Sequence, residues 1–325
     1  MTYDVKHFGR IGVLMGGYSS ERDISLKSGR AVVEALKSAG CDAAALDIVE
    51  RDEKKIAAFI KKADLDIAFI TLHGRLGEDG MIQAILEDLS IVFTGSGKEA
   101  SRRAINKVMT QGWLRQHNIP VAPSFGVTNR DQDSLRSILE RIHQWPVVVK
   151  PACEGSSIGV TIVGNPGALA PALHLAWQYG PEALVEQYIK GRELTVGILD
   201  QTPLPVIEIR PRAEFFDFSA KYQSGTTEYI VPADLPDKAG EDIRQTALTT
   251  HRVLGCSDLS RIDFMLDEQG RHYVLEINTI PGFTSVSLLP RAAKHRGISF
   301  EQLCLQLTAL AYGKKKETGT SAVRR

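Results

Sequence analysis

Hydrophobic and polar residues alternate most clearly between residues 261 and 284, in two short runs separated by a polar segment at 268–271. The apolar positions are Ile262, Phe264 and Leu266 in the first run and Tyr273, Leu275 and Ile277 in the second. A period of two places successive side chains on opposite faces of a β-strand. The pattern therefore predicts a β-hairpin in which each strand has one apolar and one polar face.

The first hundred residues alternate apolar runs with helical patterns, which is typical of a parallel α/β layer. The expected elements are strands at 11–15 and 67–72 and helices at about 19–38 and 78–89. Ligands of such sheets bind at the carboxyl ends of the strands, where Glu21 and His73 fall. The alternatives are that Glu21 only stabilises a helix N-terminus and that His73 is a loop histidine with its hydrogen bonds satisfied.

A second unit mixes helices with short strands. A helix is expected at about 99–117, and strands at 147–150 and 160–163 enclose the glycine- and serine-rich loop 151–159. We predict an α/β protein with an α+β centre, divided into an N-terminal α/β unit, a central unit, a C-terminal unit containing the hairpin, and a disordered tail. The predicted ranges are 1–98, 99–192, 193–312 and 313–325.

The connection from Arg210 to Pro236 has little periodicity and is rich in aromatic residues. Connections of this length are usually functional lids or disordered segments, and the aromatic content argues against disorder. We interpret it as a lid whose most reactive pair is Lys221 and Tyr222. The alternative for Tyr222 is simple packing of the lid against the core.

Composition narrows the classes of partner. The 325 residues include 39 basic and 39 acidic side chains, so no overall field favours nucleic acid or an anionic membrane. No apolar run approaches the length of a membrane helix and no leader is visible, which predicts a cytoplasmic protein with neither partner. The four cysteines have no CxxC spacing, which favours reduced thiols over disulfides or zinc.

The polar face of the hairpin predicts a metal site. Pairing residue 267 with residue 272 places Asp263 opposite Glu276 and Arg261 opposite Asn278. Carboxylates about 5 Å apart repel by roughly 3 kcal/mol at an effective dielectric of about 20, and a cation converts this repulsion into affinity. Two carboxylates and an amide suit Mg²⁺ that shares its coordination with substrate phosphates. The alternative is a solvated edge hairpin.

The loop 154–159 (EGSSIG) offers an anion its backbone N–H groups and the hydroxyls of Ser156 and Ser157, with Lys150 on the preceding strand. Such loops are common, but together with the metal hairpin this one predicts a nucleotide site built from two distant segments. It is neither a Walker P-loop nor a dinucleotide fingerprint, because the glycines at 95–101 and 12–17 lack the required spacing.

The segment 279–289 (TIPGFTSVSLL) directly follows the hairpin. Its Pro281-Gly282 turn can direct backbone N–H groups at an oxyanion, and Arg261 lies beside it on the metal face. Ser287 is then placed to hold a substrate carboxylate. Contacts to a metal, to an oxyanion and to a substrate carboxylate are therefore predicted within one short stretch.

Taken in order, these motifs resemble the D-alanine–D-alanine ligases of the ATP-grasp superfamily from about residue 10 to 312. The motifs are GGYSSERDISLKSG, LHGRLGEDG, VVVKPACEGSSIGV, Lys221-Tyr222, RIDFML and EINTIPGFTSVSLLP. The resemblance implies ATP between the central and C-terminal units, a homodimer, and a role in bacterial peptidoglycan synthesis. It implies ligation of two D-alanine molecules through a D-alanyl phosphate, with release of ADP and phosphate.

The resemblance also implies roles for individual residues. Two Mg²⁺ ions, replaceable by Mn²⁺, are expected on Asp263, Glu276 and Asn278, and ATP on Lys107, Lys150, Ser157, Glu186 and Glu193. The implied substrate contacts are Glu21 and His73 for the first D-alanine and Lys221, Ser287 and Leu288 for the second. The implied catalytic groups are Arg261 and the Gly282 N–H at the oxyanion, with a hydrogen-bonded trio of Glu21, Ser156 and Tyr222.

Asn106 precedes Lys107 where the family commonly has Asp, a departure that only slightly weakens the lysine assignment. The Lys221-Tyr222 pair favours an amine acceptor, because relatives that form D-alanyl-D-lactate usually replace it. Two alternatives are another ATP-grasp carboxylate–amine ligase with a different acceptor and a non-catalytic ATP-binding protein. A third, a metal-assisted phosphohydrolase, requires a water path that a lid would close.

Overall fold

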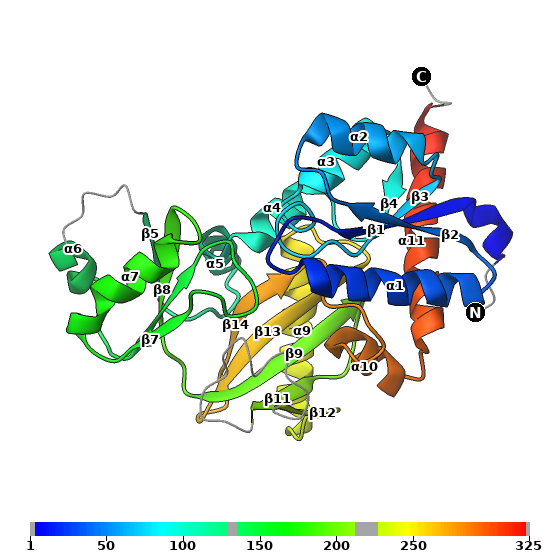
Figure 1. Cartoon of the computed structure of the whole chain (residues 1–325). Helices are drawn as coiled ribbons and strands as arrows, with labels where there is room; N and C mark the ends of the chain where they lie inside the picture. Colours follow the sequence, from blue (N-terminus) through cyan, green and yellow to red (C-terminus); the bar gives the residue numbers. More distant parts are fainter. Residues whose placement is uncertain (1–3, 129–134, 212–226, 323–325) are drawn as a thin grey trace.

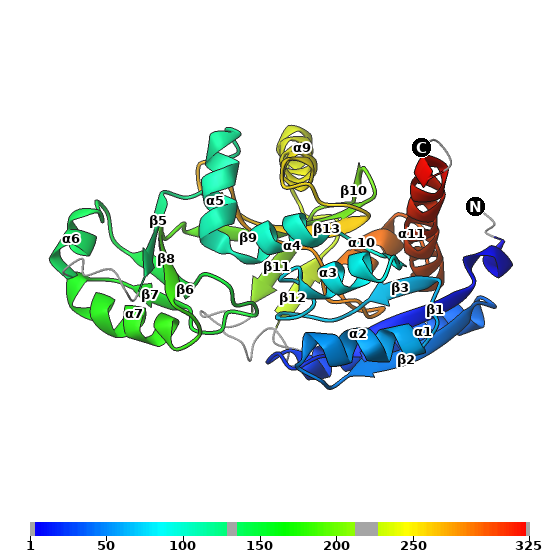
Figure 2. The ribbon, with the colours of Figure 1, turned by 90° about the horizontal axis from the view of Figure 1, so that it is seen from above.

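The chain folds around three β-sheets formed by successive parts of the sequence. A computed structural model describes residues 4–128, 135–211 and 227–322. The central sheet lies at one end of the molecule and the N-terminal sheet at the other, with the C-terminal sheet between them, as Figure 1 and the view from above in Figure 2 show. The predicted α/β class with an α+β centre is confirmed.

The N-terminal sheet is parallel, with strand order β2-β1-β3-β4. Its elements are η1 (Val5–Phe8), β1 (Arg10–Gly16), α1 (Arg22–Ser38), β2 (Asp42–Ile48), α2 (Glu53–Lys62), β3 (Ile67–Ile70), α3 (Met81–Asp88), β4 (Val92–Phe93) and the following α4 (Lys98–Ile105). The loops after β1 and β3 meet at one edge, where the Ser19 hydroxyl donates to the His73 carbonyl at 2.7 Å. Parallel strand order thus brings two distant loops together.

The central sheet is antiparallel, with strand order β5-β8-β6-β7. Its region contains α5 (Lys107–Gln116), β5 (Ser124–Thr128), α6 (Leu135–Glu140), β6 (Val147–Pro151), β7 (Thr161–Val163), η2 (Pro166–Ala168), α7 (Leu169–Trp177) and β8 (Glu182–Gln187). The buried residues of its own apolar cluster all lie between 127 and 185. The glycine- and serine-rich loop joins β6 to β7, as predicted.

The C-terminal sheet is also antiparallel, with strand order β12-β11-β9-β13-β14 and β10 paired to β9. Its elements are β9 (Gly191–Leu199), β10 (Thr202–Pro203), β11 (Ile207–Pro211), β12 (Thr227–Ile230), α9 (Asp237–Val253), β13 (Leu259–Asp267), β14 (His272–Asn278), α10 (Leu288–His295) and α11 (Phe300–Ala322). One apolar cluster joins it to the N-terminal sheet, with Val13, Phe69, Leu259 and Leu307 among its buried members.

The helix predicted at 99–117 is interrupted at Asn106, where the backbone is extended (φ −87°, ψ 103°). The Asn106 side-chain oxygen accepts from the Met109 N–H at 2.9 Å. Asparagine is a strong N-cap, so α4 ends and α5 begins at this residue. The interruption places Lys107 in the first turn of α5.

The C-terminal helix corrects a prediction. The tail 313–325 was expected to be disordered, but α11 extends to Ala322. Lys314 Nζ contacts the Asp258 carboxylate at 2.7 Å and the carbonyls of Phe93 and Gly95 at 3.1 and 2.9 Å. These buried acceptors, which lie on other elements, hold α11 at Lys314.

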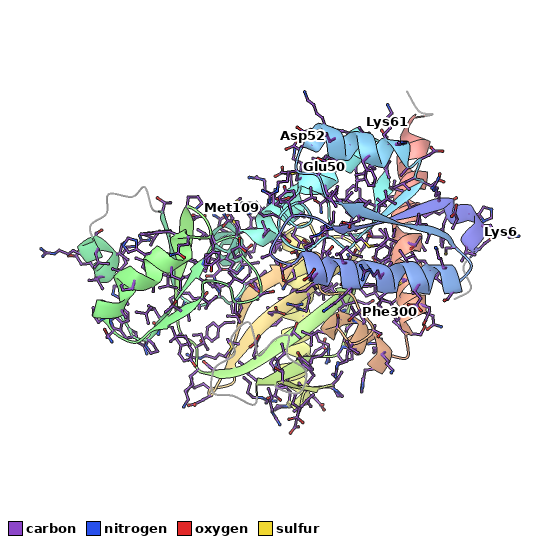
Figure 3. The ribbon with its side chains drawn as sticks, in the orientation of Figure 1. Lys6, Glu50, Asp52, Lys61, Met109 and Phe300 are labelled. Atoms are coloured by element: carbon purple, nitrogen blue, oxygen red, sulfur yellow. The ribbon has the colours of Figure 1, made fainter. Side chains whose placement is uncertain are left out.

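The helix is also tied to the segment after the hairpin. Phe300, labelled in Figure 3, begins α11, and its ring centroid lies 5.5 Å from that of Phe283.

The predicted connection 210–236 includes β12, which pairs with β11. Its candidates Lys221 and Tyr222 lie outside the described residues. None of the described helices is long and apolar enough to cross a membrane. The exact domain boundaries stay a prediction.

Candidate active site

The hairpin β13–β14 has the predicted pairs at its metal end. Asp263 lies opposite Glu276 and Arg261 opposite Asn278. Near the turn the register differs by one residue from the expected one, because Leu266, and not residue 267, pairs with His272. A β-bulge between Asp263 and Phe264 absorbs the difference, since a bulge sets two residues of one strand against one of the other.

The bulge changes which side chains of β14 face the core. The buried residues are Val274 and Ile277, at 1% and 4% exposure, and Leu275 is only half-buried. The prediction that Tyr273 and Leu275 share the apolar face with Ile277 was wrong, because the extra residue reverses the alternation. Leu275 instead faces a cavity beside Glu276.

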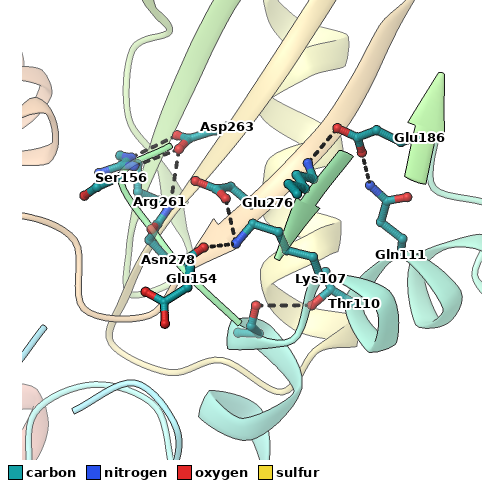
Figure 4. Close-up of polar contacts among 12 residues, drawn as sticks. Lys107, Thr110, Gln111, Glu154, Ser156, Glu186, Arg261, Asp263, Glu276 and Asn278 are labelled. Atoms are coloured by element: carbon teal, nitrogen blue, oxygen red, sulfur yellow. Dashed lines mark hydrogen bonds and ion pairs between the residues drawn. The ribbon is translucent and has the colours of Figure 1, made fainter. Parts of the chain in front are cut away.

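Each carboxylate of the hairpin is paired with a cation from the protein. Arg261 binds Asp263 through two contacts of 2.9 and 2.7 Å, and the Thr195 hydroxyl donates to Asp263 at 2.6 Å. The Asn278 amide donates to Asp263 at 3.2 Å. Lys107 Nζ lies 3.1 Å from Glu276, and this ion pair is marked by a dashed line in Figure 4. The opposed carboxylates are therefore neutralised by separate partners.

These residues fit a sparsely held Mg²⁺. Asp263, Glu276 and Asn278 offer only oxygen ligands, which Mg²⁺ prefers, and so few protein ligands leave coordination for phosphate oxygens. Over the described parts of the chain, no three His, Cys, Asp or Glu side chains lie together as a complete protein metal cluster would. A metal held by these few oxygen donors would complete its coordination with phosphate oxygens or water.

A second ion pair lies deeper, on the central sheet. Lys150 on β6 contacts Glu186 on β8 at 2.6 Å, with side-chain exposures of 8% and 4%. Lys107 also donates to the Glu154 carbonyl at 2.6 Å. Burial alone lowers the pKa of Lys107, but the Glu276 carboxylate outweighs burial and the pKa is raised. Lys107 therefore stays charged at neutral pH.

A cavity of about 200 Å³ lies between the central sheet and the hairpin. Its polar lining includes all the predicted ATP-binding residues, namely Lys107, Lys150, Ser157, Glu186 and Glu193, together with Asp263 and Glu276. Sequence reasoning missed its apolar walls, among them Val148, Ile162, Ile189, Met265 and Leu275. Apolar walls with a few convergent polar groups are typical of a small-molecule site.

An adjoining cavity of about 260 Å³ opens toward the N-terminal sheet. Both cavities are lined by Lys107, Glu154, Ile158 and Glu276. The second is also lined by Glu21, Glu78 and Asn278. Two ligands can thus meet at one boundary, where a lysine and a carboxylate face both spaces.

Two predicted members of the catalytic trio are in contact. The Ser156 hydroxyl donates to Glu21 at 2.7 Å, which joins the β6–β7 loop to the N-terminal sheet. Ser156 and Ser157 have φ angles of 53° and 60°, in the left-handed region that non-glycine residues rarely adopt. Such backbone strain is frequent at ligand-binding loops. The third member, Tyr222, lies outside the described residues.

His73 is buried and has both ring nitrogens partnered. Nδ1 lies 2.9 Å from the Ile280 carbonyl and Nε2 lies 3.2 Å from the Ser28 hydroxyl. Burial lowers the pKa of His73, so the ring is neutral at physiological pH. These contacts agree with the satisfied-histidine alternative, and the predicted role in substrate binding stays a prediction.

Glu78 is a residue that sequence reasoning missed. It accepts from the N–H groups of Gly74 and Ile280 at 2.7 and 3.3 Å. Burial, followed by the nearby Glu21 carboxylate, raises its pKa to about 8. The only sequence signal was its place in LHGRLGEDG, because its burial and the approach of Glu21 arise from the fold. A strongly perturbed carboxyl in a cavity is a candidate functional group.

The predicted acceptor residues cluster after the hairpin. Ser287 Oγ accepts from the Thr284 N–H at 3.0 Å, and a side chain at Gly282 would approach that hydroxyl to 3.4 Å. Leu288 begins α10 and packs against the core shared with the N-terminal sheet. Gly282, Ser287 and Leu288 lie outside both cavity linings, so their substrate contacts stay predictions.

Comparisons with known proteins place this geometry in a family. Residues 113–309 match the family model described as the D-ala D-ala ligase C-terminus. A D-alanine–D-alanine ligase of Geotalea uraniireducens (strain Rf4) is 47% identical over 311 residues, which cover 96% of this chain and 98% of that one. The chain belongs to the D-alanine–D-alanine ligase family.

Structures of D-alanine–D-alanine ligases agree with this assignment. The ligase from Bacillus anthracis complexed with ATP matches with a TM-score of 0.84 at 32% identity, covering 95% of this chain and 99% of that one. A second structure of the Bacillus anthracis ligase matches with a TM-score of 0.83 at 33% identity. The ATP-grasp architecture expected from the sequence is therefore confirmed.

Proposed function

We propose that the protein is an ATP-dependent D-alanine–D-alanine ligase of peptidoglycan precursor synthesis. The observation that carries the proposal is the pair of adjoining cavities that share Lys107 and Glu276. A ligase of this type must hold a nucleotide and an amino acid so that the γ-phosphate and a carboxylate meet. Family membership supports both ligands.

In the first step, the carboxylate of one D-alanine attacks the γ-phosphorus of ATP. The bond to the β–γ bridging oxygen breaks, and ADP leaves from a D-alanyl phosphate. Lys107 and Lys150 would hold the phosphates, with Ser157 on the loop above them. Glu186 would lie on the adenine side and Glu193 on the ribose side. Phosphoryl transfer depends mainly on such positioning and charge stabilisation.

In the second step, the amine of another D-alanine attacks the carbonyl carbon of the acyl phosphate. The amine loses a proton, and phosphate leaves with the electrons of the C–O bond. Arg261 and the Gly282 N–H would stabilise the tetrahedral oxyanion. Ser287 and Leu288 would receive the second substrate, with Lys221 contributing from the connection after β11.

The first D-alanine would bind through its ammonium to Glu21, with His73 nearby. Ser156 would keep Glu21 oriented and, with Tyr222, hold the site closed. Asp263, Glu276 and Asn278 would hold two Mg²⁺ ions, with Mn²⁺ as a substitute. When bound, the metal would neutralise phosphate charge. We further propose that the protein is a cytoplasmic homodimer that binds neither nucleic acid nor membrane. The balanced charge supports only the last part of this proposal.

Phosphate release tests the proposal. Release should require ATP, Mg²⁺ and D-alanine together, and the product should be D-alanyl-D-alanine by mass spectrometry. Replacing D-alanine with L-alanine is the matched control, because only the configuration changes. Equal release with L-alanine, or release without any amino acid, would overturn the substrate assignment.

A further inference from the structure

A chain of buried polar side chains lies next to the cavity of about 200 Å³, which we assign to the nucleotide. Gln111 on α5 is 1% exposed, and its amide N–H donates to Glu186 Oε2 at 2.8 Å. The other oxygen of Glu186 holds Lys150 at 2.6 Å. Lys150 and Glu186 line the cavity, whereas Gln111 does not. Figure 4 shows Gln111 and Glu186 joined in this way.

The amide of Gln111 is oriented from both ends. Its carbonyl accepts from the Ser124 hydroxyl, which in turn accepts from the Arg115 guanidinium. A carboxylate can only accept hydrogen bonds, so the NH₂ group must face Glu186 and the carbonyl must face Ser124. Ser124 is the direct cross-strand neighbour of Glu186. Gln111 therefore bridges two adjacent strands of the central sheet.

This arrangement controls how Glu186 uses its two oxygens. With Oε2 held by Gln111, only Oε1 is engaged by Lys150. Without that donor, a buried carboxylate lacks a partner on one oxygen, which is unfavourable. It would be satisfied by rotating so that both oxygens bind Lys150. Such a rotation would move the ammonium group from its present position, in which Lys150 lines the cavity.

We propose that Gln111 is a positioning residue of the nucleotide site: its amide holds one oxygen of Glu186 and so keeps Lys150 directed toward the nucleotide phosphates. The inference rests on the proposed function for the identity of the ligand. It predicts that the hydrogen-bond donor at position 111, rather than the volume of the side chain, determines nucleotide affinity.

Two substitutions at position 111 distinguish the effect of the hydrogen-bond donor from the effect of side-chain volume. Gln111→Met preserves the size of the side chain but removes the donor, and should raise KM for ATP about tenfold with kcat and KM for D-alanine little changed. Gln111→Lys retains a donor for Glu186 and should keep KM for ATP within about threefold. A packing role gives the opposite order, because only lysine adds a buried charge.

Gln116→Met is the matched control, since it makes the same substitution on an exposed position of the same helix. Ser124→Ala, which removes only the hydroxyl behind the amide, provides a second measurement if Gln111→Met does not fold. It should raise KM for ATP about threefold. Unchanged KM values for Gln111→Met and Ser124→Ala, or a higher KM for Gln111→Lys than for Gln111→Met, would overturn the inference.

Calorimetric titration with ADP separates this inference from the proposed function. Weaker ADP binding by Gln111→Met than by Gln111→Lys supports the positioning role even if the wild-type protein does not ligate D-alanine. Equal ADP affinities for the two variants contradict the positioning role even if ligation is normal.

Discussion

The ion pair between Lys107 and Glu276 allows a direct test of the proposed metal site. In Lys107→Met the side chain keeps its unbranched shape and most of its length but loses its charge. The two charged atoms are 3.1 Å apart, which corresponds to an attraction of about 5 kcal/mol at an effective dielectric of about 20. Desolvation of both ions offsets much of this attraction.

The net loss of folding stability in Lys107→Met can be bounded from the exposure of the Glu276 side chain. Breaking a fully buried pair costs about 3–5 kcal/mol because one charge is left unpaired. The Glu276 side chain is 21% exposed and can regain some water, so we expect a loss of about 2–3 kcal/mol. For a chain of 325 residues this lowers the melting temperature by about 3–5 °C.

Mg²⁺ should reverse part of this loss. In the variant, Glu276 faces Asp263 without its lysine, and a divalent cation can take the place of the missing charge. Millimolar Mg²⁺ without nucleotide should therefore raise the melting temperature of Lys107→Met more than that of the wild type. Differential scanning calorimetry, with Na⁺ added to equal ionic strength, measures both effects.

A matched control uses the same substitution at an exposed ion pair. Lys190 contacts Glu268 at 2.9 Å, with side-chain exposures of 78% and 62%, and such exposed pairs contribute little to stability. Lys190→Met should change neither stability nor the response to Mg²⁺. Equal stabilisation of Lys107→Met and wild type by Mg²⁺, or a response that survives in Lys107→Met/Glu276→Gln, would refute the reasoning.

Three further changes test other parts of the site. Burial raises the pKa of Glu78 to about 8 in the folded protein, so the folded state binds the proton more tightly than the unfolded state does. The stabilisation that results is complete at pH values below the ordinary pKa of a glutamate and is lost as the pH rises to about 8. The melting temperature of the wild type should therefore fall relative to Glu78→Gln across that window, and a constant difference would contradict the burial argument. Ser156→Ala removes the 2.7 Å bond to Glu21 and should raise KM for D-alanine about tenfold in initial-rate assays; an unchanged KM would exclude the contact from substrate binding. Lys314→Met breaks the contact with Asp258 and should lower the free energy of unfolding in urea by about 2 kcal/mol, whereas unchanged stability would mean that α11 is held by its apolar contacts alone.

Much of the site could be predicted from local pattern. Alternation placed Asp263 and Glu276 on one face of a hairpin, and the β6–β7 loop was recognised from its glycines and serines. The residues that the family resemblance assigns to ATP line one cavity, and their role stays a prediction. The hairpin and the loop could be predicted because strand alternation and turn chemistry depend on neighbouring residues, which a single sequence displays.

Other features required the assembled sheets. The bulge between Asp263 and Phe264 turned Leu275 toward the cavity, and the apolar alternation of the sequence does not mark it. The counterion of Glu276 comes from α5, and the raised pKa of Glu78 comes from burial and from the nearby Glu21 carboxylate. Neither relation has a signature in sequence spacing.

Local residue pattern specifies the types of chemical group and the strands and loops that carry them. Which charge faces which depends on the packed chain, as the pairing of Lys107 with Glu276 and the link from Gln111 to Glu186 show. Backbone periodicity is set within a few residues, whereas burial, desolvation and long-range ion pairing depend on groups that packing brings together.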